Sequence, residues 1–415
     1  MTVIAMLIAI AAFFATVFRS RLSISGKVRR SLPALPAFLL IGWWSPAFGV
    51  DTPQLEALLD EVRTDARMPG LRAAIRFPDG RIVTAAVGFA DRDAEIPLDD
   101  HVGMPGGSTG KTFVAALTML LVEDEVLSLD DPVSDWLGDT EWYHRLPNAD
   151  DIRVRHLLSH TSGIRDYPGT ARFKWAMVRR VLRDGSAYFE PEELIRFVLD
   201  KRPLFPAGEG FRYSDAGYLV LGRVIERASG RAYYDLLQER ILDPLELTEV
   251  RPQDRSVLSG ITPGYMGGAS NLKKDGRMKF DPRSEWTGGG LITNPTMLVE
   301  FYAALAEGRV VSQESLGAMM SGGWQNPRTP EWQYGYGMFV IERGAAIDHG
   351  GLWPGYRTHV THNLHSGVTI AVQTNRDGRV NLLELVDQIR GLVLESDVPA
   401  ESESSMSCTE SRGPS

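Results

Sequence analysis

The chain has 415 residues, 43% of them hydrophobic and 23% charged, so it can bury the core of one large domain or of two. Acidic and basic residues are mixed along the chain and sum to a formal net charge of -9, which leaves no basic stripe for a nucleic-acid backbone. We therefore expect no nucleic-acid partner. The one cysteine, Cys408, excludes an intrachain disulfide and a cysteine-rich metal centre.

Residues 1–49 are predicted to be a signal or membrane-anchor segment. An apolar run at 3–18 is followed by basic residues, and a second apolar run ends at Ala47-Phe48-Gly49. This layout is typical of a secretory signal, and a retained segment would anchor the chain by its N-terminus. We expect an exported protein, periplasmic or membrane-anchored, with its main domain outside the cytoplasm. If translation starts near Val28, N-terminal sequencing of the native protein will show it.

The next part of the chain predicts a helix, a hairpin and then a long helical region. Residues 52–67 have the periodicity of an amphipathic helix, and residues 71–91 contain two strand-like runs around a Pro-Asp-Gly turn. From residue 111 to about 250 the chain is mostly helical, with clear periodicity at 191–202 and 218–241.

The C-terminal part returns to strands after a helix in residues 291–308. We expect the strands at 334–343, 356–364 and 366–376, and a closing helix at 382–395. Strands at both ends with helices between them predict an α+β domain over 50–395, with one sheet from the two chain ends and an inserted helical subdomain. The serine-rich, acidic residues 396–415 are expected to form a disordered tail.

The stretch GMPGGSTGKT, residues 103–112, fits two kinds of site. A phosphate-binding loop needs G-x-x-x-x-G-K-[ST], and Gly110, Lys111 and Thr112 supply its second half. Pro105 stands where the first glycine belongs, and it has no N–H to offer a phosphate. The preceding residues are charged and broken by proline, whereas such a loop follows a buried strand. We therefore expect no nucleotide site.

The other interpretation is a serine nucleophile. Ser108 and Lys111 lie three residues apart where a helix is predicted to begin, so the hydroxyl and the amine project from one face. The first turn of a helix favours the negative charge that develops in acyl transfer. The alternative is an ordinary helix-capping serine with a solvated lysine.

Tyr213 is the candidate base. It follows a glycine-rich turn and precedes an amphipathic helix. Tyrosine has a free pKa of about 10, and a neighbouring ammonium such as that of Lys111 favours the phenolate. The alternative is a packed aromatic residue with a satisfied hydroxyl.

Asp348-His349-Gly350-Gly351 ends a short apolar run and leads into a Trp-Pro-Gly turn. Adjacent glycines let a ligand approach a strand closely, so that backbone N–H groups can point at an oxyanion. A bulge at a strand end is the alternative. His349 is a candidate donor to the substrate, or else one half of a surface pair with Asp348.

Metal binding has weak support, because His156 and His160 in HLLSHTSG have no carboxylate arranged to complete a site. We expect no metal and no cofactor.

Several collinear segments resemble the serine β-lactamase-related family, which includes class C β-lactamases, D,D-carboxypeptidases, D-amino-acid amidases and related esterases. The segments are GGSTGKTFVAALTMLLVEDEVLSLDDPVSDWL, VRHLLSHTSGIRDY, FRYSDAGYLVLGRVIERASG, WTGGGLITNPTMLVEFYAAL, DHGGLWPGYRTHV and GVTIAVQTNRD. The resemblance covers roughly residues 55–390. It implies a β-lactamase/transpeptidase-like fold, in which helices flank an antiparallel sheet and a helical subdomain lies across the cleft.

The resemblance also implies roles for individual residues. Ser108 stands as the acylated nucleophile of the S-x-x-K motif, with Lys111 as its partner. Tyr213 opens the Y-x-N motif as general base, and residues 349–351 stand where the family has K-T-G or H-x-G. The backbone N–H groups of Ser108 and Leu352 would then form the oxyanion hole.

Asp215 departs from the family motif, which has asparagine there. An amide both accepts and donates hydrogen bonds, whereas an ionised carboxylate only accepts. A carboxylate near Lys111 would keep the lysine protonated, which favours Tyr213 as the base. It would also repel anionic substrates and leave an amide carbonyl without a donor, unless Asp215 turns away from the cleft.

We therefore predict an exported serine hydrolase that cleaves an ester or amide bond, with a small molecule or a peptide, including peptides with D-residues, as substrate. Asp215 and the Thr109-Gly110 pair inside the S-x-x-K motif motivate an alternative, an inactive binding or scaffolding protein. A second alternative is a D,D-carboxypeptidase or β-lactamase. Arg357 is either a ligand for a substrate carboxylate or a solvated strand residue.

Overall fold

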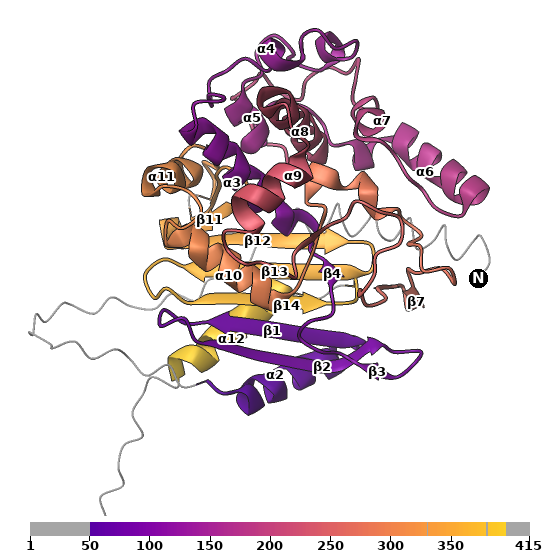
Figure 1. Cartoon of the computed structure of the whole chain (residues 1–415), viewed down its shortest axis with the longest axis vertical. Helices are drawn as coiled ribbons and strands as arrows, with labels where there is room; N and C mark the ends of the chain where they lie inside the picture. Colours follow the sequence, from indigo (N-terminus) through magenta and orange to yellow (C-terminus); the bar gives the residue numbers. More distant parts are fainter. Residues whose placement is uncertain (1–49, 330, 379–380, 396–415) are drawn as a thin grey trace, which may run out of the picture.

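Both ends of the described chain contribute strands to one sheet (Figure 1). The computed structural model describes residues 50–329, 331–378 and 381–395, so the expected signal or anchor segment and the expected tail lie outside the described residues. The sheet has nine antiparallel strands in the order β3-β2-β1-β14-β13-β12-β11-β10-β9. Their bounds are β1 Gly70–Arg76, β2 Ile82–Asp91, β3 Ile96–Pro97, β9 Trp324–Gln325, β10 Gln333–Tyr334, β11 Phe339–Ile341, β12 Ala346–Trp353, β13 Tyr356–Asn363 and β14 Thr369–Thr374.

The register between β1 and β14 joins the N-terminal and C-terminal parts, with Leu71 opposite Thr374 and Arg76 opposite Thr369. The predicted hairpin is confirmed as β1 and β2. The predicted strand at 334–343 is divided into β10 and β11, because Gly337 turns the chain with a φ of +72°.

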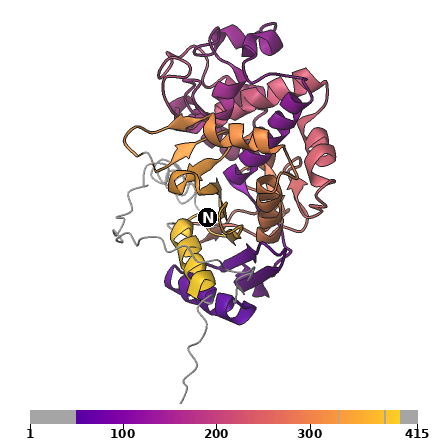
Figure 2. The ribbon, with the colours of Figure 1, turned by 90° about the vertical axis from the view of Figure 1, so that its left-hand side faces the viewer.

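Helices cover both faces of the sheet. The bounds of the helices that flank it are α2 Thr52–Asp65, α10 Pro295–Ala306 and α12 Leu382–Glu395. Helices α2 and α12 lie side by side on one face (Figure 2), where Leu71, Ala73 and Ile75 pack in one apolar cluster with them. Ala74 belongs to the larger cluster that includes α10. Alternate residues of β1 therefore serve opposite cores, as the two-residue period of a strand requires.

The helical subdomain lies between β2 and α10 in sequence and above the sheet in Figure 1. Its helices are α3 Gly110–Glu123, α4 Val133–Leu137, α5 Val154–Leu158, α6 Ala171–Asp184, α7 Pro191–Ile195, α8 Asp215–Ser229 and α9 Tyr233–Leu237. A further helix, α11 Gln313–Ser321, follows α10 in sequence and packs against α3 and α10. The predicted α+β architecture with an inserted helical subdomain is confirmed.

Two predicted helices are shorter than the periodicity indicates. Helix α7 ends at Ile195, and the hydrogen bonds that follow reach only three residues back, from Phe197 N–H to the Leu194 carbonyl. Helix α8 ends at Ser229, and Gly230, with a φ of +67°, caps its C-terminus, so the stretch 218–241 is broken in the middle.

Small sheets attach loops to this frame. Strand β8, Leu291–Thr293, lies between β4, Met104–Pro105, and β5, Arg251–Pro252. Strand β6, Tyr265–Met266, pairs with β7, Ala269–Ser270. The pairing of β4 with β8 brings the GMPGGSTGKT stretch next to the WTGGG segment.

Within residues 50–329, 331–378 and 381–395, no helix combines the length and the apolar character needed to cross a membrane.

The Asn375 side chain connects the C-terminal end of β14 to β1 and β2 by hydrogen bonds. Its side chain is buried, accepts a hydrogen bond from Gly70 N–H at 2.8 Å and donates to the carbonyls of Phe89 and Ala90 at 3.1 and 3.0 Å. We expect Asn375→Ala to lower the free energy of unfolding by about 2–4 kcal/mol, because these buried backbone groups lose their partner. Urea denaturation followed by circular dichroism measures it.

The control is Asn381→Ala, an exposed side chain that accepts from Glu384 N–H at the start of α12. We expect it to cost about 1 kcal/mol or less. Equal losses in the two variants would contradict the role of Asn375.

Candidate active site

Ser108 lies in a tight turn that leads into α3. The turn is a single 3-10 turn, Gly107–Thr109, and α3 begins at the next residue. Gly107 has a φ of +58°, and a side chain there would place its Cβ 2.6 Å from the Leu352 nitrogen. The Ser108 turn therefore rests directly on the backbone of β12.

Gly351 of β12 allows the Ser108 turn to approach this strand closely. A Cβ at Gly351 would lie 1.9 Å from the Gly106 carbonyl oxygen. The register between β12 and β13 runs without interruption from Ala346 opposite Asn363 to Trp353 opposite Tyr356. Gly351 is therefore a close-contact position in a regular strand, and the bulge alternative does not apply.

Lys111 is fully buried, with its side chain 0% exposed, and its ammonium is surrounded by partners. Its Nζ lies 3.3 Å from Ser108 Oγ and 2.7 Å from Asp215 Oδ1, and it also donates to the Gly288 carbonyl. Burial on its own would lower the pKa of Lys111, but the Asp215 carboxylate and then Tyr213 outweigh it, so the pKa lies above its usual value. Lys111 is therefore a permanent cation in this site.

Asp215 does not turn away from the cleft. It is the first residue of α8, and the N-cap Ser214 accepts from Gly217 N–H. Its own N–H donates to Asp166 Oδ1 at 2.9 Å. The start of α8 thus directs the carboxylate at Lys111, in a region where the helix dipole favours a negative charge.

Tyr213 lies beside the same ammonium, with Lys111 Nζ 5.0 Å from the centre of its ring. The His160 ring packs at 4.0 Å between centroids, and His160 Nδ1 accepts from Ser214 N–H at 3.2 Å. The HLLSHTSG motif thus packs against the tyrosine. Within the described residues no group of three His, Cys, Asp or Glu side chains is arranged to hold a metal ion.

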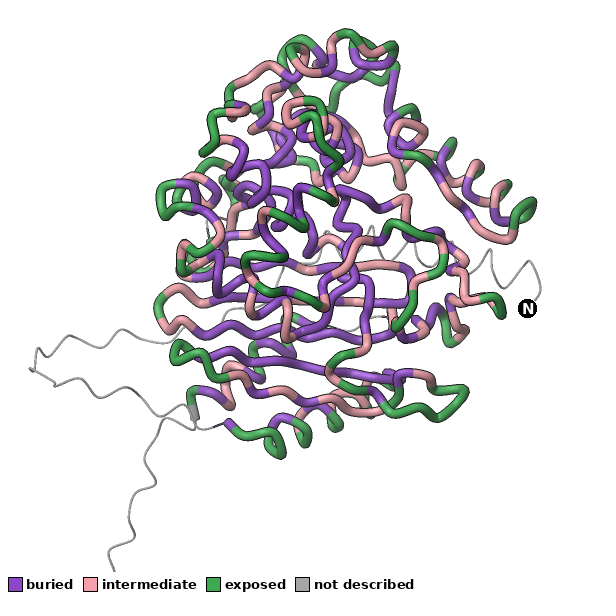
Figure 3. The backbone as a smooth tube through the Cα atoms, viewed as in Figure 1, coloured by how far each residue is buried: buried purple, intermediate pink, exposed green. Residues whose placement is uncertain are grey.

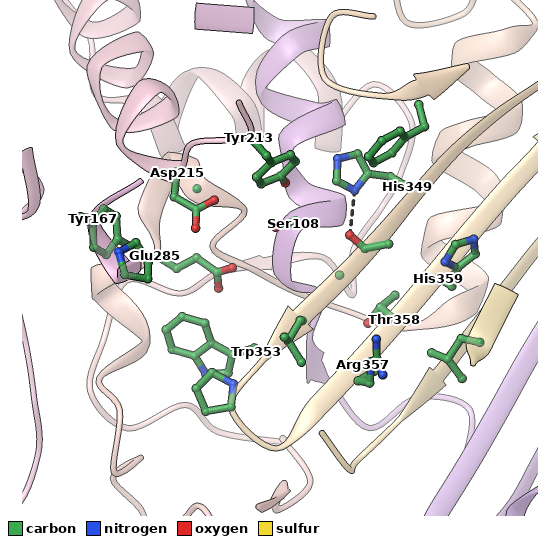
Figure 4. A pocket seen from close by; sticks show the side chains of 18 of the residues that line it. Ser108, Tyr167, Tyr213, Asp215, Glu285, His349, Trp353, Arg357, Thr358 and His359 are labelled. Carbon is green, nitrogen blue, oxygen red and sulfur yellow. Dashed lines mark hydrogen bonds between the residues drawn. The ribbon is translucent and has the colours of Figure 1, made fainter. Parts of the chain in front are cut away.

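His349 is buried in the cleft wall, and both of its ring nitrogens face groups of the chain. Nδ1 donates to the Gly350 carbonyl at 2.8 Å (Figure 4), and Nε2 is 3.2 Å from the Tyr334 hydroxyl. Burial, and after it the charge of Lys111, lower the pKa of His349 to about 4. The neutral imidazole in this arrangement orients Gly350 and Tyr334. The neighbouring Asp348 pairs with His359 at 2.7 Å instead.

Glu285 is a site residue that the sequence did not reveal. Its side chain is nine-tenths buried, and one of its oxygens, Oε2, has no hydrogen-bond partner among the described residues. A Cβ at Gly288 would lie 3.7 Å from Glu285 Cγ and 4.0 Å from Asp215 Cβ, so the two carboxylate side chains flank one glycine. Burial raises the pKa of Glu285 to about 8; the Lys111 ammonium opposes this rise and the Asp215 carboxylate adds to it. No periodicity or motif marked this residue.

A cavity of about 600 Å³ opens in front of Ser108. One end holds the polar residues described above, and the other end is apolar. The apolar end is lined by Phe173, Met177, Phe189 and Phe280. A second aromatic group, Phe211, Trp332 and Phe339, lines the cavity next to Tyr334 and His349. Arg357 also lines the cavity, where it is half-buried and donates to the Gly378 carbonyl at 3.1 Å, so it is not a solvated strand residue.

This fold and site define a class of protein. An antiparallel sheet with an inserted helical subdomain, and a serine and lysine one turn apart facing a glycine-rich strand, are the features of the β-lactamase/transpeptidase-like fold. The family described as Beta-lactamase matches residues 55–393. The chain therefore belongs to the beta-lactamase family.

Three proteins illustrate the similarity. Penicillin-binding protein 4* of Bacillus subtilis is 27% identical over 315 residues, which are 70% of this chain and 64% of that protein. Esterase EstB of Burkholderia gladioli is 30% identical over 214 residues, or 49% of this chain and 53% of the esterase. The crystal structure of a D-stereospecific amidohydrolase from Streptomyces sp. has a TM-score of 0.70 and 24% identity, and the match covers 81% of this chain and 98% of that one. The chain thus spans between half and two thirds of the length of these two curated relatives.

The burial of Glu285 predicts a pH-dependent stability. In the unfolded chain its carboxyl ionises near the ordinary value of 4.5, whereas in the folded protein it keeps its proton up to about pH 8. Between these values the unfolded state has lost a proton that the folded state holds, so the free energy of unfolding falls as pH rises. Glu285→Gln removes this loss. We expect its Tm, relative to the wild type, to rise by on the order of a few degrees between pH 4.5 and 8.

The control is Glu314→Gln, because Glu314 is exposed at the start of α11. Its Tm difference from the wild type should change much less over the same pH range, because folding does not remove this side chain from water. Calorimetry at several pH values provides both measurements, and a constant difference for Glu285→Gln would contradict the buried-acid interpretation.

Proposed function

We propose that the protein is an exported serine hydrolase that cleaves an ester or amide bond through an acyl-enzyme on Ser108. The observation that carries the proposal is the contact between Ser108 Oγ and Lys111 Nζ at 3.3 Å, with the lysine charge balanced by Asp215 at 2.7 Å. An exposed, solvated lysine would not need such a partner. The buried ion pair therefore supports a function at Ser108 over a simple helix cap.

In the first step Tyr213 acts as the base. Asp215 keeps Lys111 protonated, so the lysine cannot take a proton, whereas the ammonium stabilises the Tyr213 phenolate electrostatically. The phenolate takes the Ser108 proton while Oγ attacks the substrate carbonyl, and Tyr213 then returns that proton to the leaving alcohol or amine. In the second step Tyr213 takes a proton from water, the resulting hydroxide attacks the acyl carbonyl, and Ser108 is released with its proton restored.

The negative charge on the tetrahedral oxygen needs fixed donors. We assign this role to the backbone N–H groups of Ser108 and Leu352. The contact between the Ser108 turn and β12 through Gly107 and Gly351 supports it, since it keeps these two nitrogens on adjoining segments. His349 is then a positioning residue. Its ring holds the Gly350 carbonyl, and Gly350 directly precedes Gly351, where β12 contacts the Ser108 turn.

The cavity favours a neutral substrate with a bulky apolar acyl group. Aromatic and apolar side chains line its far end, while Asp215 and Glu285 lie close to the serine. Asp215 accepts but cannot donate, so the site provides no side-chain donor from this position to an amide carbonyl. These features favour esters over amides, β-lactams and anionic cell-wall peptides. The similarity to an esterase is in agreement, whereas the similarity to a penicillin-binding protein supports only the general chemistry.

A fluorophosphonate tests whether Ser108 is activated. We expect the intact mass to rise by one adduct, mapped to Ser108 by peptide analysis, because only an activated serine displaces fluoride rapidly. The Ser108→Ala variant should show no adduct. An unlabelled wild-type protein would instead favour the alternative of a binding or scaffolding protein that kept the fold without turnover.

Asp215→Asn tests the substrate preference. The amide restores a donor for a substrate carbonyl and removes a negative charge, so we expect kcat/KM for amides or β-lactams to rise at least about ten-fold relative to esters. The ratio is measured with an ester and an amide that share one acyl group. A ratio that stays flat or falls would refute this role for Asp215, even if Ser108 is labelled as expected.

A further inference from the structure

The outer face of α6 carries the most exposed large apolar side chain of the described residues. Trp175 is 72% exposed, and Leu182, two turns further along the same face, is 55% exposed. The opposite face of the helix is buried through Phe173, Met177 and Val181. The apolar residues on the buried side account for the packing of α6 against the protein. They do not account for an exposed tryptophan and leucine on the other side.

Basic residues surround these two side chains. Helix α6 and the residues after it, 171–188, contain five basic residues and one acidic one, and residues 270–283 contain five basic and two acidic ones. We call the two segments together the basic face. Its excess of positive charge stands out in a chain whose net charge is -9.

The two segments are joined. Ala187 forms a bridge with Phe280, Ser186 Oγ donates to the Met278 carbonyl at 3.0 Å, and Asp281 N–H donates to the Ala187 carbonyl at 3.1 Å. A recess of about 360 Å³ lies between them. Four of the residues that line this recess are arginines, namely Arg180, Arg183, Arg277 and Arg283.

Ion pairs neutralise part of the basic face but not all of it. Arg180 pairs with Glu193, and the other three arginines of the recess pair with neighbouring aspartates. Arg179 and Lys274 are exposed and make no ion pair with another described residue. Arg179 lies between Trp175 and Leu182 on the helix, so cationic and apolar side chains alternate along one stripe.

We propose that the basic face docks the protein on an anionic phospholipid membrane, with α6 lying in the plane of the interface. Lysine and arginine side chains attract anionic headgroups, and an exposed tryptophan and leucine bury themselves at the boundary of the acyl chains. A nucleic acid satisfies the charges but offers no apolar layer for Leu182. The combination of the two kinds of side chain therefore favours lipid.

Docking in this way orients the cavity. Phe173 and Met177 on the inner face of α6 line the apolar end of the cavity, as does Phe280 from the second segment. Figures 1 and 3 show α6 at the edge of the helical subdomain, with its outer turns exposed. Membrane contact through α6 would place this end of the cavity next to the lipid surface. The docking itself does not depend on the proposed hydrolase activity.

A pair of matched cysteine variants tests the proposal in the full-length chain. In a Cys408→Ser background, Leu182→Cys carries an environment-sensitive fluorophore on α6, and Leu394→Cys carries it on α12, where Leu394 is 57% exposed. Figure 1 shows the two helices on opposite sides of the molecule. Val50, the first described residue, packs in the same cluster as α12, so the second probe also reports contact made through the N-terminal end.

We expect vesicles of phosphatidylcholine with phosphatidylserine to enhance and blue-shift the probe at 182 but not the probe at 394. Phosphatidylcholine alone should have no such effect, and added salt should reverse it. Arg179→Gln and Lys274→Gln, added to the labelled variant, should each weaken vesicle binding about five-fold. Circular dichroism checks that the variants are folded.

Three results would overturn the proposal. The first is an unchanged probe at 182 with both kinds of vesicle. The second is a response at 394 without one at 182, which would assign membrane contact to the N-terminal end alone. The third is a response at 182 to a single-stranded oligonucleotide but not to anionic vesicles, which would identify the basic face as a nucleic-acid surface.

Discussion

The buried ammonium of Lys111 is the constraint around which the site is built. A cation removed from water costs several kcal/mol unless charged or polar groups replace its hydration. Here the replacements come from distant parts of the chain: Asp215 at the start of α8 and the Gly288 carbonyl before β8, together with Ser108 one turn away. Helices α3 and α8 and the segment before β8 can therefore pack together only in an arrangement that satisfies this charge. That arrangement also places the serine at the mouth of the cavity.

Two further titratable groups near Lys111, Glu285 and His349, are kept neutral. Asp215 already balances the lysine, so a second ionised carboxylate would leave an uncompensated charge in a poorly hydrated site. Burial keeps the proton on Glu285 at neutral pH and keeps His349 uncharged. Glu285 and His349 therefore add no charge to the cavity, which agrees with its aromatic lining. The whole cleft accordingly suits an uncharged, apolar acyl group better than an anionic one.

Helix α6 links this cleft to the outer surface of the protein. Its inner face contributes Phe173 and Met177 to the cavity, and its outer face presents Trp175 among basic side chains. A helix that packs on one side only is usually polar on the other. The departure from that rule at Trp175 and Leu182, next to a second basic segment, indicates a surface with a binding partner. Cavity and surface therefore belong to one continuous part of the structure.

Local sequence patterns determined much of this protein. The periodicity and turn residues located α2, α10, α12 and the β1–β2 hairpin, and the spacing of Ser108 and Lys111 placed a hydroxyl and an amine on one helical face. Local patterns failed where long-range contacts decide. Helix α7 is shorter than its periodicity predicts, and only the contact with Lys111 decides between the two orientations left open for Asp215. Glu285 had no sequence signal at all, because burial of a charge depends on which distant segments surround it. Spacing along the chain determines which side chains share one face of a helix or strand. Only tertiary packing brings side chains of separate elements together and sets their protonation states.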